Sequence, residues 1–129
     1  MQKMIVLMKR KPGLSREEFR EHYEGVHAVL GHKYFEGLLL DFVRYYPTDL
    51  APFPSQWNSF VPSTDDADSY DAIAVYTFRD EEAISEYARR MEDPEISRTM
   101  REDEDRFLDR SGCRYGFCEV SQGQGILAS

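Results

Sequence analysis

Cysteine is scarce in this chain, and the motifs that hold common cofactors are missing. Its 129 residues contain only Cys113 and Cys118, without a C-x-x-C pair, so neither a zinc knuckle nor a thioredoxin-type redox site is supported. The motifs G-x-G-x-x-G, P-loop, G-x-S-x-G and H-E-x-x-H are also absent, which leaves nucleotide cofactors, serine hydrolysis and zinc proteolysis without support. We therefore expect no cofactor and no metal.

Long apolar runs and an excess of positive charge are lacking as well. No apolar stretch approaches the roughly 20 residues of a membrane span. The basic residues 9–11 follow the first apolar stretch, which is the wrong order for a signal peptide. Sixteen Lys and Arg against 24 Asp and Glu give a net charge of −8, which repels nucleic acid and anionic lipid. These features predict a cytoplasmic protein with free thiols and with neither nucleic-acid nor membrane partners.

The length and the residue pattern fit one globular domain over residues 1–129. Hydrophobic residues make up 41% and charged residues 31%, which is ordinary for a folded chain. Apolar patterning predicts strands over residues 4–8, 38–46, 70–78 and 114–120. Capping signals at Ser15, Asp80 and Asp93 predict helices over about 15–31, 80–91 and 93–110. Residues 47–69 form a proline-rich loop or arm, and residues 121–129 a small-residue tail.

The resulting order, β-α-β-β-α-β, predicts a ferredoxin-like α+β fold with a four-stranded antiparallel sheet and helices on one face. Strand 4–8 is apolar on both sides, so the face without helices needs a cover. A second copy of the same sheet is the simplest cover, and it would make a dimeric α+β barrel with a cavity. Alternatively, the proline-rich segment 47–69 forms the cavity within its own chain.

The first helix carries the first candidate for chemistry. Phe19, Tyr23, Val26 and Leu30 mark its apolar face, and Gly31 is a plausible end. His27 follows Tyr23 by four residues and borders this face. A half-buried histidine can exchange a proton near neutral pH, although a core histidine with satisfied ring nitrogens is the alternative.

Two further histidines lie near His27 in the sequence. His22 and His32 are each five residues away, which is about 140° around an α-helix, so the three rings should not converge on a metal. His22 falls on the charged side and is expected to face solvent. The orientation of His32 does not follow from the pattern.

A carboxylate and several aromatic residues complete the candidate site. Asp103 precedes the apolar Phe107 by four residues, so it lies beside the buried face of the last helix. It could orient an imidazole, or it is a surface acid. Aromatic side chains near the strands could line a pocket for a planar ligand, although they also build ordinary cores. The candidates for substrate binding are Tyr23, Tyr45, Trp57 and Tyr76.

Two segments near the N-terminus resemble the EthD family. Residues 7–19, LMKRKPGLSREEF, and residues 23–28, YEGVHA, follow its pattern of a strand, K-R-x-P-G-L-S-x-E-x-F, an aromatic residue and His-Ala. Residues 70–74, 80–83 and 103–109 resemble later parts of the family in the same order. The resemblance implies a dimeric α+β barrel with His27 facing a cavity. In this sequence Tyr23 stands where the family more often has Trp.

The resemblance also implies a class of chemistry, because related barrels include cofactor-free decarboxylases, cyclases, dehydratases and monooxygenases of aromatic and polyketide compounds. We therefore expect a cofactor-free lyase that acts on an aromatic or polyketide-like small molecule, with His27 as general acid/base. Two alternatives remain open. One is a cofactor-independent monooxygenase of a phenolic substrate, which would consume oxygen. The other is a non-catalytic dimer that binds a small molecule and releases no product.

Overall fold

The computed structural model describes residues 3–48, 50, 53 and 69–121. Trp57 and most of the proline-rich segment and the tail lie outside these residues. The order of the elements confirms the sequence prediction. They are β1 (Lys3–Met8), α1 (Arg16–His22), the π-helical turn η1 (Tyr23–His27), α2 (Ala28–Tyr34), β2 (Leu39–Tyr45), β3 (Ala72–Phe78), α3 (Glu81–Glu92), α4 (Pro94–Phe107), the 3-10 turn η3 (Arg110–Gly112) and β4 (Arg114–Cys118).

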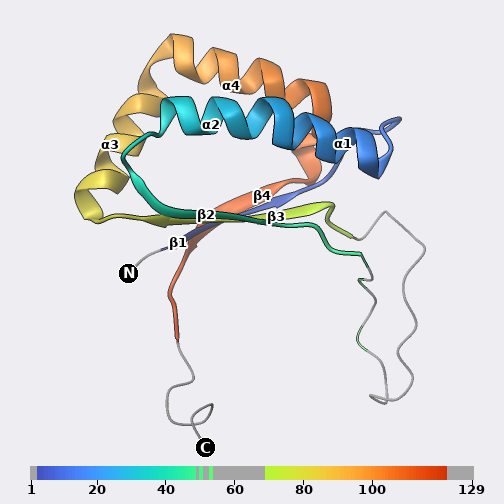
Figure 1. Cartoon of the computed structure of the whole chain (residues 1–129), viewed down its shortest axis with the longest axis horizontal. Helices are drawn as coiled ribbons and strands as arrows, with labels where there is room; N and C mark the ends of the chain where they lie inside the picture. Colours follow the sequence, from blue (N-terminus) through green and yellow to red (C-terminus); the bar gives the residue numbers. More distant parts are fainter. Residues whose placement is uncertain (1–2, 49, 51–52, 54–68, 122–129) are drawn as a thin grey trace, which may run out of the picture.

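The four strands form one antiparallel sheet in the order β2-β3-β1-β4. Seen from the side, the sheet is one layer and the helices form a second layer on one of its faces (Figure 1). This is the ferredoxin-like α+β fold that the sequence predicts. No helix in the described part of the chain is long and apolar enough to cross a membrane.

Side chains that alternate along the strands divide the sheet into two faces. Ala72, Ala74 and Phe78 of β3 are buried against the helices. Ile73 and Val75 point to the opposite face, where the cross-strand pairs Leu7–Ile73 and Ile5–Val75 lie. In the described part of the chain, no helix covers this second face (Figure 1).

Two groups of buried side chains fill the space between the sheet and the helices. The first joins α1, η1 and the end of α4 to the sheet, and the second joins α3 and the start of α4 to it. The first group consists of Met8, Phe19, Tyr23, Ala28, Ala72, Phe107 and Leu108. The second consists of Met4, Phe35, Leu38, Phe78, Ala83 and Met100.

The first helical segment begins as predicted but continues differently. Ser15 and Glu18 form the expected capping box. The predicted end at Gly31 is wrong, because α2 continues to Tyr34. Val26 is also not on the buried face, since it is 41% exposed. The reason is the π-helical turn, in which the Ala28 amide donates to the Tyr23 carbonyl and one extra residue enters the turn.

The starts of the later helices are confirmed. Asp80 accepts a hydrogen bond from the Ala83 amide, and Asp93 caps α4 ahead of a proline in its first turn. Helix α4 ends at Phe107, slightly before the predicted Arg110, because Leu108 is extended and pairs with Arg10 in a β-bridge.

Phe19 tests the first core group. Its side chain is 1% exposed and packs against the Tyr23 and Phe107 rings, so Phe19→Ala should lower the free energy of unfolding by about 3–5 kcal/mol. The control is Val29→Ala on the exposed side of α2, which should change it by less than about 0.5 kcal/mol. Urea unfolding measures both, and equal effects would contradict this core.

Candidate functional site

The structure brings together two of the site residues predicted from the sequence. His27 ends the π-helical turn and Asp103 lies on α4, and Nδ1 of His27 is 2.9 Å from Oδ2 of Asp103. Both side chains are buried, at 5% and 0% exposure. A buried carboxylate needs such partners because its charge is otherwise expensive to remove from water. Asp103 is therefore not a surface acid.

His22 joins the same carboxylate, which corrects the expectation that it faces solvent. Nε2 of His22 lies 2.9 Å from Oδ1 of Asp103, and its side chain is only 23% exposed. Arg106 adds a longer contact to Oδ1, at 3.3 Å. Asp103 thus holds a histidine on each of its two oxygens.

The π-helical turn explains why the two histidines converge. An α-helix would separate residues five apart by about 140°, but a π-helical turn aligns residue i with residue i+5. His22 and His27 have this spacing, and both rings pack against Phe107, with centroids 4.9 and 5.0 Å away. The spacing of five residues between His22 and His27 was the sequence signal for their shared contact with Asp103. It indicates that the two rings converge only if the π-helical turn is already known.

The charges of this cluster follow from its contacts. Burial alone would raise the pKa of Asp103, but the hydrogen bonds from His27 and His22 outweigh it and hold the pKa below its usual value. Burial also lowers the pKa of His27, and Asp103 offsets this only in part. The cluster at neutral pH is thus an ionised carboxylate beside a neutral His27.

An ionised carboxylate only accepts hydrogen bonds, so it determines which ring nitrogen carries the proton. His27 donates from Nδ1 and His22 from Nε2. Nε2 of His27 then carries a lone pair, and it has no hydrogen-bond partner among the described residues. This nitrogen can accept a proton and return it.

A second set of contacts fastens the π-helical turn to the sheet. Glu24 of the turn receives hydrogen bonds from Nε and Nη2 of Arg44 on β2, at 2.6 and 2.8 Å, and from the Tyr46 hydroxyl. The bond from Arg44 is the main reason that the pKa of Glu24 falls to about 2. The Arg44 guanidinium also lies over the Tyr23 ring. Sequence reasoning missed this ion pair, since its partners are 20 residues apart and lie on different elements.

Tyr23 and Tyr76 lie next to this arrangement. Tyr23 is fully buried, and its ring is 5.9 Å from that of His27. Its hydroxyl has no hydrogen-bond partner in the described part of the chain. Burial, together with the neighbouring hydroxyl of Tyr76, raises the pKa of Tyr23, and burial likewise raises that of Tyr76. Both hydroxyls therefore stay protonated.

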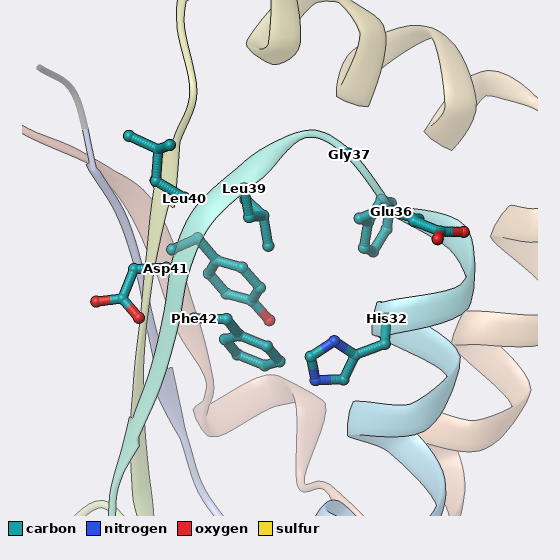
Figure 2. Close-up of a pocket in the computed structure, with 10 residues that line it drawn as sticks. His32, Glu36, Gly37, Leu39, Leu40, Asp41 and Phe42 are labelled. Atoms are coloured by element: carbon teal, nitrogen blue, oxygen red, sulfur yellow. The ribbon is translucent and has the colours of Figure 1, made fainter.

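A cavity of about 490 Å³ opens between α2 and β2, on the helix side of the sheet. Tyr76 and Phe42 form part of its wall as a stacked pair with centroids 4.5 Å apart. His32 extends from α2 toward Phe42 across this space, and Leu39 points into it (Figure 2). His27 does not line the cavity, whereas Tyr76, the neighbour of Tyr23, does.

The remaining candidates are more dispersed. Tyr45 is 55% exposed and pairs with Ile73 on the sheet face away from the helices, so it does not join Tyr23 and Tyr76. Trp57 lies outside the described residues. Within the described residues, no group of three or more His, Cys, Asp or Glu side chains is arranged to hold a metal ion.

The chain combines a ferredoxin-like α+β fold with a buried cluster of two histidines and an aspartate. The EthD domain matches residues 11–111, and the chain belongs to the EthD family. No curated protein matches the sequence.

Solved structures share the fold at low sequence identity. An EthD family protein from Bacillus halodurans is 19% identical, with a TM-score of 0.58 over 94% of this chain and 99% of that one. A protein from Arabidopsis thaliana is 16% identical, with a TM-score of 0.57 over 95% and 97%. A dimeric ferredoxin-like protein of unknown function from Thermobifida fusca is 13% identical, with a TM-score of 0.57 over 92% and 90%.

Asp103→Asn tests the electrostatics of the cluster. The carboxylate is the group that raises the pKa of His27 against the effect of burial, so its neutral replacement should lower that pKa further. Histidine side-chain NMR during a pH titration measures the change. The control Glu102→Gln removes an exposed acid from the same helix and should leave the pKa of His27 unchanged. An unchanged or higher pKa in Asp103→Asn would show that Asp103 does not stabilise the protonated ring.

Proposed function

We propose that this protein is a cofactor-free lyase, a decarboxylase, dehydratase or cyclase, that acts on an aromatic or polyketide-like small molecule. His27 is the general acid/base. The observation that carries the proposal is the buried Asp103 carboxylate on Nδ1 of His27, which leaves Nε2 without a partner among the described residues. A histidine oriented in this way is suited to proton transfer.

The same imidazole serves each of these reactions. In a dehydration, Nε2 removes a proton from the carbon next to the one that bears a hydroxyl, and the imidazolium returns it to that hydroxyl, which leaves as water while the carbon–carbon double bond forms. In an aldol-type cyclisation, Nε2 removes a proton from a carbon beside a carbonyl, the resulting carbanion forms a bond to a second carbonyl carbon, and the imidazolium protonates the alkoxide oxygen. In a decarboxylation, Nε2 first takes the proton of the substrate's carboxyl or phenol group. After the bond to the carboxylate carbon breaks and carbon dioxide leaves, the imidazolium donates this proton to the carbon that has lost carbon dioxide. Asp103 stabilises the imidazolium that forms in either direction and keeps the ring in position.

Two buried tyrosines would connect the substrate to this histidine. Tyr76 lines the cavity, and Tyr23 is a neighbour of both Tyr76 and the His27 ring. The Tyr23 hydroxyl has no partner in the described structure and stays protonated, so it is available to donate to a substrate oxygen. In this proposal the substrate occupies the cavity and reaches toward Tyr23.

One observation favours a second candidate function, a non-catalytic protein that binds a small molecule. The cavity is lined by His32, Tyr76 and Phe42 but not by His27. If the His–Asp cluster only stabilises the core, a ligand would bind in the cavity and be released unchanged. Turnover therefore distinguishes the two functions.

His27→Ala provides this test. We expect turnover to fall by about 100- to 10,000-fold, since a positioned proton donor contributes this much. The measurement is a mass-spectrometric screen of phenolic and polyketide compounds, with and without oxygen, followed by kinetics on any substrate found. Glu21→Gln on the exposed side of α1 is the control, and circular dichroism shows that both variants are folded. Near-normal turnover in His27→Ala would overturn the catalytic role.

We also propose that the sheet face without helices pairs with a second copy of the chain. Ile5, Leu7, Ile73 and Val75 give this face an apolar centre. The Thermobifida fusca protein of the same fold is dimeric, which supports the proposal. Such a face is favoured as a contact because its burial removes apolar surface from water.

Val75→Glu tests the dimer. A carboxylate at the centre of a buried apolar contact is strongly unfavourable, so the solution mass should fall from twice 15.1 kDa to 15.1 kDa. Light scattering after gel filtration gives this mass. Val29→Glu adds the same charge to an exposed position on α2 and should remain dimeric. A wild-type protein of 15.1 kDa would refute the pairing.

A further inference from the structure

The cavity between α2 and β2 has a distinctive shape and charge. Its wall is the stacked pair of Phe42 and Tyr76, whose ring planes differ by only 12°. The His32 ring faces this pair from the helix, with its centroid 5.8 Å from that of Phe42 (Figure 2). A volume of about 490 Å³ is in the range of small-molecule sites, and flat aromatic walls favour planar ligands.

The polar groups in the lining suit hydroxyl groups on such a ligand. The Tyr76 hydroxyl is protonated and can donate or accept a hydrogen bond. The His32 side chain is exposed and lines the same cavity, and its ring nitrogens can donate a hydrogen bond to a ligand hydroxyl or accept one from it. A planar ring with hydroxyl groups at its edges matches both.

The charges disfavour an anionic ligand. Among the described residues that line the cavity, none is a lysine or an arginine, whereas Glu36 and Asp41 are part of the lining. Both acids are exposed, and neither forms an ion pair within the described residues. Figure 2 shows Asp41 on the far side of β2 from His32, so its effect is that of a nearby charge and not of a direct contact. Such charges act over a distance of about 10 Å at moderate salt.

Three arginines near the cavity are already paired with other acids. Nε of Arg44 lies 2.6 Å from Glu24, that of Arg79 lies 3.1 Å from Asp80, and that of Arg90 lies 3.2 Å from Glu86. Each acid balances the charge of its arginine, including that of Arg44, whose guanidinium lies 4.6 Å from the centroid of the Phe42 ring. Glu36 and Asp41 form no ion pair within the described residues, so their charges repel a carboxylate.

We propose that this cavity binds planar hydroxyaromatic compounds in their uncharged form and discriminates against the corresponding carboxylates. The inference rests on the proposed function insofar as it names the substrate class of the same site. Among the proposed reactions it favours cyclisation or dehydration of a neutral substrate over decarboxylation of an acid. His32 is then a binding residue that the sequence did not identify.

Calorimetry with a matched pair of probes tests the proposal. The probes are 2-naphthol and 3-hydroxy-2-naphthoic acid, which differ by one carboxylate. At pH 7 and low salt, 2-naphthol should bind at least tenfold more tightly, and high salt should narrow the difference because it screens the acids. Equal affinities, tighter binding of the acid, or no binding of 2-naphthol would each overturn the proposal.

Variants assign these effects to the residues named. His32→Ala should weaken 2-naphthol binding by about five- to tenfold, as expected for one lost hydrogen bond and ring contact. The double variant Glu36→Gln/Asp41→Asn should reduce the preference for 2-naphthol over 3-hydroxy-2-naphthoic acid by at least threefold. The control Glu17→Gln/Glu21→Gln removes the same charge from α1 and should leave the preference unchanged. An equal narrowing in the control would refute the role of the local acids.

The outcome is separable from that of the proposed function. Binding of 2-naphthol without turnover of any tested compound would reject the lyase and retain the cavity. Turnover that depends on His27, together with strong binding of the acid, would retain the lyase and reject the ligand class.

Discussion

One buried carboxylate organises the centre of this molecule. Asp103 is fully enclosed, and its two oxygens hold the rings of His22 and His27 at 2.9 Å each. A charge in this position is stable only while its hydrogen bonds persist, so the cluster connects α4 firmly to the first helical segment. The π-helical turn, the fastening of Glu24 to Arg44, and the packing of Phe107 against both imidazoles all maintain that connection.

Much of the fold was accessible from the sequence because its signals are local. Capping residues at Ser15, Asp80 and Asp93 marked three helix starts, and alternation along residues 72–78 marked the central strand and its two faces. The pairing of His27 with Asp103 was also foreseen as a possibility, since both residues border apolar faces.

The remaining features of the site depend on tertiary structure. The position of His22 follows from a π-helical turn, which holds one residue more than a turn of an α-helix. The spacing rules for an α-helix therefore do not predict this position. The spacing of apolar residues predicted that Val26 is buried, but the same turn places it at the surface. The cavity combines α2 with β2 and β3, so the position of His32 relative to Phe42 and Tyr76 is set by packing and not by spacing.

The hydrogen-bond pattern around Asp103 is the central claim, and nitrogen-15 NMR of the histidine side chains tests it most directly. At neutral pH we expect His27 to carry its proton on Nδ1 and His22 to carry a proton on Nε2, because each of these nitrogens donates to the same ionised carboxylate. A spectrum in which His27 carries its proton on Nε2, or in which both rings exchange freely between tautomers, would contradict the account.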